Sequence, residues 1–346
     1  MNGPPLRFAN ACKHSSAPAD RFITHHLQTP MLHKPTLADY AQLHFIVLIW
    51  GFTAILGKLL EPLDPSAVVL FRTLLAVGGM GALLAIRRQS VRVSRADTGR
   101  LLATGGLIAL HWTTFFAAAR IANVSVCLAG LATSSLWASL LEPLLLRRRV
   151  RAVEVTLGLV VMAGLYLIFR FEFDKVLGLA VAVFSAMLSS LFTIINSRFA
   201  QRHDALVISF YEMAGALIGA FGLWQLTKVL DPQNANHAQY VPDAPMQWVW
   251  LGVLALVCTV YAYSVGVRLL RKFSPFLAIL TVNLEPVYGI VLAVLIFGQS
   301  ERMTVGFYAG TLVILAAVLT YSLWSSRHRP APDALMTNEV FTQQTP

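Results

Sequence analysis

Long apolar runs separated by short polar connections dominate the chain from residue 43 to residue 325. Most of these runs approach the ~20 residues that a helix needs to cross the hydrocarbon core of a bilayer. Because the connections are mostly short, consecutive helices must run antiparallel. The pattern predicts an all-α integral membrane protein with ten transmembrane helices, at residues 43–60, 66–86, 101–120, 124–146, 152–170, 177–197, 205–230, 246–268, 275–298 and 303–325.

Composition supports a lipid environment. Hydrophobic residues make up 56% of the 346 residues, charged residues make up 13%, and the mean hydropathy is +0.64. A soluble domain carries about a quarter charged residues. The chain has too few charges to coat a water-facing surface, so we expect the lipid bilayer to be its partner.

The net charge of +10 does not indicate a nucleic-acid partner, because the basic residues follow the predicted topology. The even-numbered connections and the segment after the last span carry Arg87, Arg88, Arg92, Arg95, Arg100, Arg147, Arg148, Arg149, Arg151, Arg198, Arg202, Arg268, Arg271, Lys272, Arg327 and Arg329. The odd-numbered connections carry Arg120, Arg170, Lys175, Lys228 and Arg302. The positive-inside rule therefore predicts that both termini are cytoplasmic, in what we expect to be a bacterial inner membrane.

The chain also contains an internal repeat. At one constant offset, Phe52-Thr53, Lys58, Asp64 and Phe71-Arg72 recur as Phe192-Thr193, Arg198, Asp204 and Tyr211-Glu212, and the segment from Ser125 resembles the segment from Ser274. Residues 43–170 and 176–325 thus form two halves of five spans each. An odd number of spans per half forces the halves into opposite orientations, which is the architecture of many secondary transporters.

The predicted tails, residues 1–42 and 326–346, are polar and are expected to be disordered and cytoplasmic. Metal binding by His14, His25, His26 and His33 is the weaker alternative for the N-terminal tail. The three cysteines, Cys12, Cys127 and Cys258, are odd in number and unclustered, so neither a disulfide framework nor a metal motif is expected. No cofactor motif is present either.

Several short motifs resemble permeases of the drug/metabolite transporter superfamily, specifically the EamA-like ten-helix family. These are the segments from Trp50 to Lys58, Phe71-Arg72, Leu284 to Gly289, and Ile296 to Gly298. His111-Trp112, Phe115-Phe116 and Leu141 to Pro143 are similar to one bacterial branch. The resemblance covers residues 43–325 and implies ten helices in inverted repeats and export or exchange of small metabolites. The chain departs from the family pattern where the ninth span ends in Gly298-Gln-Ser-Glu301 instead of Gly-Glu-Arg.

Charged residues inside spans are the first candidates for function, because a charge near the bilayer centre is costly. Glu285 lies near the predicted midplane and precedes Pro286, which removes a backbone donor and kinks the helix. It could bind a substrate cation or a coupling proton, or it could be a protonated acid bonded between helices. Glu142 is a weaker candidate for the same roles, and it is followed by a second kink candidate, Pro143. It lies nearer the cytoplasmic end and could simply pair with the arginines that follow it.

Arg72 and Glu212 occupy equivalent positions in the two halves and carry opposite charges. They are candidates for gate residues that exchange partners as the halves rock, or for static pairing between helices. His111 and Trp112 lie in the middle of the third span and could contact substrate or relay a proton, or could simply pack. Trp50, Asn283 and Tyr261 are weaker candidates for lining a cavity.

A secondary transporter of small molecules, such as amino acids or related zwitterions, is the function that this pattern favours. An intramembrane enzyme is the alternative, but Gly-x-Ser-x-Gly, His-Glu-x-x-His and phosphate-loop motifs are absent from the sequence. A channel or scaffold subunit is a further alternative, although channels usually present rings of like residues. Association into a homodimer is compatible with each of these functions.

Overall fold

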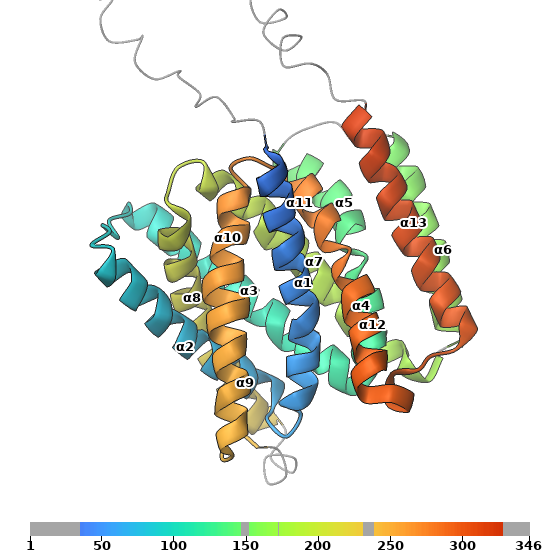
Figure 1. Cartoon of the computed structure of the whole chain (residues 1–346), viewed down its shortest axis with the longest axis horizontal. Coiled ribbons are helices and arrows are strands. Elements are labelled where there is room, and N and C mark those ends of the chain that lie inside the picture. Colours follow the sequence, from blue (N-terminus) through green and yellow to red (C-terminus); the bar gives the residue numbers. More distant parts are fainter. Residues whose placement is uncertain (1–34, 147–151, 172, 231–238, 328–346) are drawn as a thin grey trace, which may run out of the picture. The chain divides into compact units, whose positions relative to one another are not determined.

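A computed structural model describes residues 35–146, 152–171, 173–230 and 239–327. The regular secondary structure of the described part is helical, and one isolated bridge joins Leu63 and Gln239. The first half consists of α1 (Leu37–Leu59), α2 (Pro65–Ile86), α3 (Arg95–Ile121), α4 (Val124–Leu131), α5 (Ser134–Leu146) and α6 (Ala152–Phe171) (Figure 1).

The second half repeats this order of helices. It consists of η2 (Phe173–Lys175), α7 (Val176–Ala200), α8 (Ala205–Leu230), α9 (Pro245–Ala255), η4 (Leu256–Tyr261), α10 (Ala262–Leu269), α11 (Pro275–Val282), α12 (Glu285–Phe297), η5 (Gly298–Glu301) and α13 (Val305–Arg327). His14, His25, His26, His33, Cys12, the cluster Arg147, Arg148, Arg149 and Arg151, Arg329 and most of both predicted tails lie outside the described residues.

Helix-capping side chains support the repeat and correct one boundary. Asp64 accepts a hydrogen bond from the Ser66 amide at the start of α2, and Asp204 accepts one from the Leu206 amide at the start of α8. Helix α1 begins at Leu37, earlier than the predicted start at residue 43, because Thr36 and Asp39 form a capping box. The predicted N-terminal tail is therefore helical over its last residues.

The fourth and ninth predicted spans are each broken into two helices of matching length. Helices α4 and α11 contain 8 residues each, and α5 and α12 contain 13 each. Asn123 caps α4 and Ser274 caps α11, so these two residues are equivalent in the repeat. The alignment of Ser125 with Ser274 that the sequence suggested is wrong by two positions, because Ser125 lies inside α4.

The eighth predicted span is continuous but changes its winding. Helix α9 leads into η4, a π-helix of 6 residues, and then into α10. A π-helical segment is rare and is frequently found at functional sites, because the extra residue redirects nearby side chains and carbonyls. This segment faces the first half of the chain through contacts of η4 with α1 and α2.

Eight helical segments of the described chain are long and apolar enough to cross a membrane. The predicted spans 152–170 and 303–325 correspond to α6 and α13, which contain shorter apolar stretches at 159–168 and 305–317. These two helices pack side by side at one edge (Figure 1). Their backbones approach closely, because a Cβ atom on Gly310 would lie 2.8 Å from the Gly164 carbonyl oxygen.

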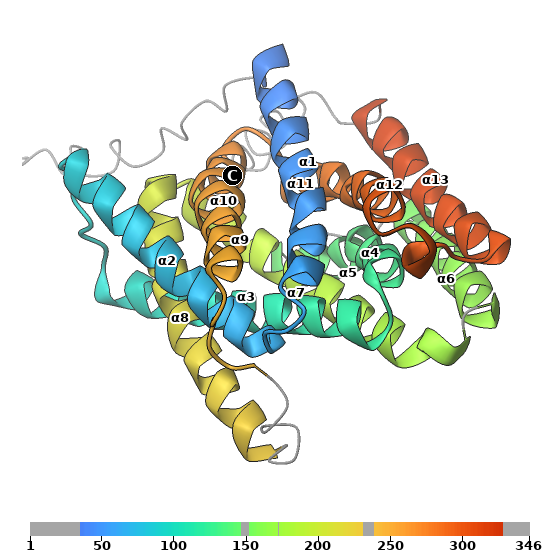
Figure 2. The same ribbon diagram turned by 60° about the horizontal axis from the view of Figure 1, so that its bottom comes forward.

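Helices of the two halves interleave instead of forming separate bodies. Helix α3 of the first half lies against α7 and α8 of the second, and α1 lies against α10 and α12 (Figure 2). A Cβ atom on Gly105 would lie 2.1 Å from the Glu212 carbonyl oxygen, and one on Gly215 would lie 2.1 Å from the Leu102 carbonyl oxygen. The crossing of α3 and α8 is therefore backbone against backbone.

Candidate functional site

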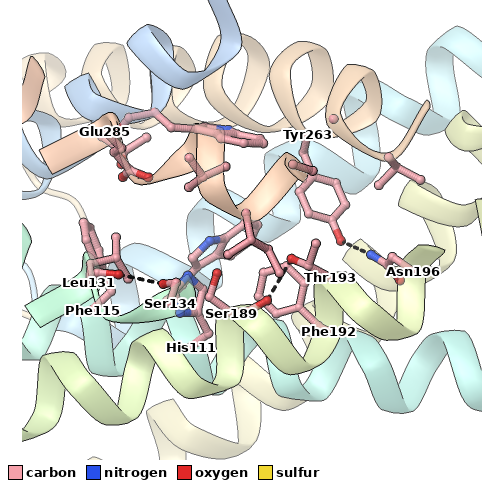
Figure 3. Close-up of a pocket in the computed structure, with 18 of the residues that line it drawn as sticks. His111, Phe115, Leu131, Ser134, Ser189, Phe192, Thr193, Asn196, Tyr263 and Glu285 are labelled. Atoms are coloured by element: carbon pink, nitrogen blue, oxygen red, sulfur yellow. Dashed lines mark hydrogen bonds between the residues drawn. The ribbon is translucent and has the colours of Figure 1, made fainter. Parts of the chain in front are cut away.

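A cavity of about 120 Å³ lies where the two halves meet (Figure 3). One water molecule needs roughly 10–15 Å³ by this measure, so the cavity can hold a small solute. Its walls come from both halves: Leu43, Trp50, Thr53, Arg72, His111, Trp112, Phe115, Leu131 and Ser134 from the first, and Ser189, Phe192, Thr193, Asn196, Tyr263, Gly266, Val267, Leu270, Ala278, Ile279, Val282 and Glu285 from the second.

Arg72 supplies the positive charge of the cavity. Its Nε donates a hydrogen bond to Thr259 Oγ1 at 2.8 Å, and its guanidinium carbon lies 3.6 Å from the centre of the Trp112 ring. Among the described residues, no carboxylate lies within ion-pair distance of Arg72. The guanidinium is thus held over an indole ring, and its two terminal nitrogens remain available for a carboxylate.

The orientation of Arg72 depends on the π-helical segment. Thr259, in η4, accepts from Arg72 and donates to the Leu254 carbonyl at 2.9 Å. The neighbouring Cys258 carbonyl accepts a hydrogen bond from Trp50 Nε1 at 3.2 Å. The π-helix of the second half therefore positions two cavity residues of the first half, Arg72 and Trp50.

Glu285 supplies the negative charge. It is buried, and its carboxylate has no hydrogen-bond donor among the described residues. It is the first residue of α12, directly after the break that ends α11 at Val282. Pro286 follows at the second helical position, where a proline is tolerated because its missing donor is not required. The predicted kink at Pro286 is thus a helix break, and it turns Glu285 into the cavity.

Arg72 and Glu285 act on each other electrostatically but are not in salt-bridge contact. A cavity that holds two opposite charges without direct contact leaves each charge partly unsatisfied. A small molecule with a carboxylate and an ammonium group could satisfy both at once.

His111 has a defined tautomer. Its Nδ1 lies 2.9 Å from the Ser185 carbonyl oxygen and 2.8 Å from Ser185 Oγ, while Ser185 Oγ donates to the His111 carbonyl. A carbonyl can only accept, so Nδ1 carries the hydrogen and the neutral ring presents Nε2 as an acceptor. Nε2 has no hydrogen-bond partner in the part of the chain that the structure describes.

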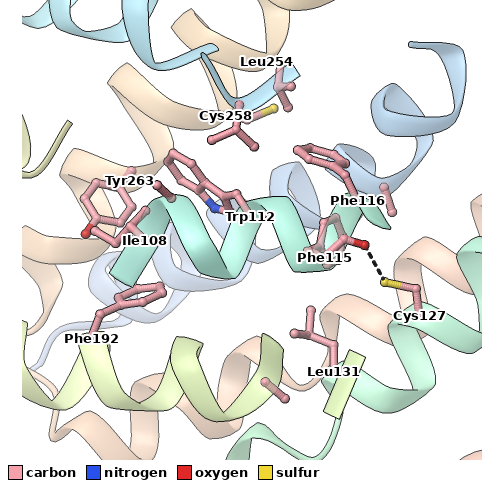
Figure 4. Close-up of a cluster of buried hydrophobic side chains, with 14 of the residues drawn as sticks. Ile108, Trp112, Phe115, Phe116, Cys127, Leu131, Phe192, Leu254, Cys258 and Tyr263 are labelled. Atoms are coloured by element: carbon pink, nitrogen blue, oxygen red, sulfur yellow. Dashed lines mark hydrogen bonds between the residues drawn. The ribbon is translucent and has the colours of Figure 1, made fainter. Parts of the chain in front are cut away.

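Several aromatic rings that line the cavity also belong to the cluster of buried hydrophobic side chains in Figure 4. The rings of Trp112 and Tyr263 are 6.3 Å apart in an edge-to-face arrangement, and Phe192 lies 5.4 Å from the His111 ring. The Cys127 thiol bonds to the Phe115 carbonyl within this cluster. The described cysteines, Cys127 and Cys258, are both buried and free.

Five hydroxyl or amide side chains of the wall were not singled out from the sequence: Thr53, Ser134, Ser189, Thr193 and Asn196. Thr53 and Thr193 donate to carbonyls of their own helices, and Ser134 donates to the Leu131 carbonyl at the end of α4. Ser134 is the first residue of α5, so it is the repeat equivalent of Glu285 at the start of α12. The internal repeat could have identified Thr53 and Thr193 as site candidates, because the two residues occupy equivalent positions in the two halves.

Other predicted residues lie outside the cavity wall. Glu142 is buried in α5, which continues over Pro143, so the break in the fourth span falls before Ser134 and not at this proline. Asn283 is buried at the C-cap of α11 and is not among the residues that line the cavity. Tyr261 is 40% exposed, so it lies on the outer surface beside Phe45.

The two predicted gate residues are separated by the fold. Arg72 lines the cavity, whereas Glu212 is fully buried in α8 behind Tyr263 and Asn196. Tyr263 Oη donates to Glu212 Oε2 at 2.8 Å, and Asn196 Nδ2 donates to the same oxygen at 3.2 Å. Among the described residues, no group of three His, Cys, Asp or Glu side chains could hold a metal ion.

Two repeats of the same helix order, with broken helices around a cavity that contains an arginine and a glutamate, are typical of transporters. The family comparison agrees: the model of the EamA-like transporter family matches residues 42–170 and again residues 176–323. The chain belongs to this family, which is part of the drug/metabolite transporter superfamily.

Comparison with solved structures shows the fold alone. Twenty solved chains match significantly. One of them, a crystal structure of a protein without further description, has a TM-score of 0.61 and 16% sequence identity, and the match covers 83% of this chain and 98% of that one. No curated protein matches the sequence significantly.

Proposed function

We propose that the protein is a secondary active transporter that exports or exchanges small zwitterionic metabolites, amino acids among them, by alternating access. The observation that carries this proposal is the presence of Arg72 and Glu285 in one cavity, both buried and not paired with each other. Arg72 would bind the substrate carboxylate and Glu285 its ammonium group. Trp112 and Phe192 would contact the apolar part.

The broken helices support the same function. In many transporters, discontinuous helices meet near the midplane, and their ends provide partial charges for the substrate. Here the breaks before Ser134 and Glu285 both fall at the cavity. We propose that the two halves are inverted five-span repeats, which brings the count to ten spans with α6 and α13 included.

Counterflow in reconstituted vesicles tests the transport function. Vesicles preloaded with an unlabelled amino acid should take up the labelled form faster than empty vesicles, and the uptake should saturate. A panel of amino acids with apolar, aromatic and charged side chains identifies the substrate class. Flux that does not saturate would indicate a channel, and chemical conversion of the amino acid would indicate an enzyme.

Glu285→Gln tests the assignment of the cavity. The glutamine retains the shape of a protonated acid but carries no negative charge with which to bind an ammonium group. We therefore expect a folded protein with weakened substrate binding. Glu142→Gln is a matched control, because it changes another buried Glu-Pro pair outside the cavity wall. Equal transport by wild type and Glu285→Gln would show that Glu285 is structural.

Localisation and topology are also proposals, drawn from the arginine and lysine distribution. Reporter fusions at residues 87–94 should indicate the cytoplasm, and fusions at residues 239–243 should indicate the opposite side of a bacterial inner membrane. A cytoplasmic signal at residues 239–243 would contradict the ten-span topology.

A further inference from the structure

A second buried carboxylate lies next to the cavity but outside its wall. Glu212 is fully buried in α8, and Tyr263 and Asn196, which both line the cavity, bond to it. Figure 3 shows Tyr263 and Asn196 at one end of the cavity and Glu285 at the other. The two buried acids are therefore associated with opposite ends of the site.

The hydrogen bonds around Glu212 leave acceptors without donors. Oε2 accepts from Tyr263 Oη at 2.8 Å and from Asn196 Nδ2 at 3.2 Å, and Asn196 Nδ2 also lies 2.9 Å from Tyr263 Oη. Glu212 Oε1 and Asn196 Oδ1 are buried and have no partner among the described residues. Buried acceptors without donors are rare, and a proton on Oε1 converts one of them into a donor.

Among the residues that the structure describes, no positive charge balances Glu212. Helices α2, α3, α7 and α10 pack against α8. Helix α10 contributes the phenol of Tyr263, and α7 contributes only the neutral amide of Asn196. Arg72 on α2 and His111 on α3 line the cavity, and neither is among the groups that act electrostatically on Glu212. A fully buried carboxylate without a counter-ion is strongly disfavoured, whereas a neutral carboxylic acid is not.

We propose that Glu212 is the proton-binding site of the transporter, separate from the substrate site, and that Tyr263 connects it to water in the cavity. On release, the Tyr263 O–H turns from Glu212 Oε2 toward a cavity water, and the carboxylic acid presents its proton at Oε2. That proton moves to the Tyr263 oxygen while the phenol proton moves to the water. Glu212 becomes a carboxylate, Tyr263 remains neutral, and the water becomes hydronium. This inference rests on the proposed transport function and assigns the coupling proton to Glu212 instead of Glu285.

One continuous segment connects the proton site with the substrate site. Tyr263 follows Thr259 by one helical turn, and Thr259 holds Arg72. A change in the hydrogen bonds of Tyr263 when Glu212 loses its proton would shift the same segment that positions the guanidinium. Protonation of Glu212 and binding of a substrate carboxylate at Arg72 are therefore coupled through η4 and α10.

Infrared difference spectroscopy on the purified full chain tests proton binding without any substrate. A pH step, recorded in H₂O and in D₂O, should produce a carboxylic-acid C=O band in the wild type and in Glu285→Gln. The band should be absent in Glu212→Gln. Loss of the band in Glu285→Gln alone, or a response to sodium instead of protons, would overturn the proposal.

A second variant keeps the acid in place. Tyr263→Phe removes one hydrogen bond to Oε2 and the connection to the cavity, so the C=O band should persist, shift to higher frequency and respond more slowly to the pH step. An unshifted band with an unchanged response rate would exclude Tyr263 as the connection. Thermal unfolding of each variant in detergent verifies that it is folded.

Vesicle transport separates this inference from the proposed function. Glu212→Gln should retain counterflow of the amino acid that the wild type transports but lose uptake driven by a pH gradient. Wild-type vesicles without counterflow would refute the transport function and leave the infrared result intact. Gradient-driven uptake by Glu212→Gln at the wild-type rate would refute the proton site and leave the transport function intact.

Discussion

Lys58 Nζ lies 2.7 Å from Glu301 Oε1, and this ion pair connects the end of α1 in the first half with η5 in the second. Glu301 is fully buried and also accepts hydrogen bonds from Ser125, at 3.0 Å from the backbone amide and 3.1 Å from Oγ. The carboxylate thus lies at the N-terminus of α4, where the helix dipole favours an anion. The acid that departs from the family pattern in sequence has a defined structural role.

A second ion pair connects the halves at the opposite end of α1. Lys272 Nζ lies 2.7 Å from Asp39 Oδ1, and Asp39 belongs to the first turn of α1. Helix α1 is therefore attached to the second half at both of its ends. Asp97 Oδ2 and His203 Nε2, 3.0 Å apart, form a further contact between the halves. If the halves move as proposed, these contacts would have to separate, whereas Arg72 and Glu212 are not paired in this structure.

Removing either ion pair should open the cavity toward the side of the membrane at which that pair holds α1. In a cysteine-free background with Thr53→Cys in the cavity wall, Glu301→Gln should increase labelling by an impermeant thiol reagent from the side where α1 ends. Asp39→Asn should increase labelling from the side where α1 begins. Labelling from each side is compared in right-side-out and inverted vesicles.

The control for this prediction is Asp174→Asn, which removes an ion pair between Lys175 and an exposed carboxylate. Such pairs contribute about 0–1 kcal/mol, so no change in labelling is expected. If Glu301→Gln and Asp39→Asn behave like this control, the two ion pairs do not restrain the movement of the halves.

The crossing of α3 and α8 should be intolerant of any side chain. Gly105→Ala places a methyl group where the Glu212 carbonyl oxygen lies 2.1 Å away, and backbone atoms cannot move aside easily. We expect destabilisation of about 1–3 kcal/mol or more. Gly106→Ala is the matched control, because nothing lies within 4 Å of the added atom. Thermal unfolding in detergent should separate the two variants, and equal melting temperatures would contradict the close crossing.

Thr259→Val should weaken substrate binding without removing the charge of Arg72. The buried Nε of Arg72 loses its acceptor, a loss of about 1.5–3 kcal/mol for a hydrogen bond to a charged group. We expect an increase in the substrate concentration for half-maximal counterflow. Thr73→Val is the control, since Thr73 is buried beside Arg72 but bonds only to its own helix. Equal effects of the two substitutions would show that Thr259 does not position Arg72.

His111 should respond differently to its two amide replacements. An asparagine amide lies near the position of Nδ1, so His111→Asn can keep the bond to Ser185 but loses the acceptor in the cavity. A glutamine amide reaches the position of Nε2 and keeps that acceptor. We expect His111→Gln to retain more transport and His111→Asn to retain more thermal stability. The reverse order would show that Nε2 does not contact the substrate.

The sequence was sufficient for the membrane class, the family and the repeat, because these depend on apolar run length and on a motif that recurs at a constant offset. It also identified the two opposite charges of the cavity, Arg72 and Glu285, since a charge inside an apolar run is visible without a structure. The positions of Tyr261 and Asn283 were not predictable, because which face of a helix is covered depends on its neighbours.

Tertiary structure alone decided how these residues meet. Arg72 lines the cavity, whereas Tyr263 of α10 and Asn196 of α7 lie between Glu212 and the cavity. The ion pairs Lys58–Glu301 and Lys272–Asp39 join residues that are far apart in the chain. The π-helix that positions Arg72 was not visible in the sequence, because its residues read as part of one continuous apolar span. Local sequence determines which segments are apolar and helical, whereas the partners of a buried polar group are set by packing between helices.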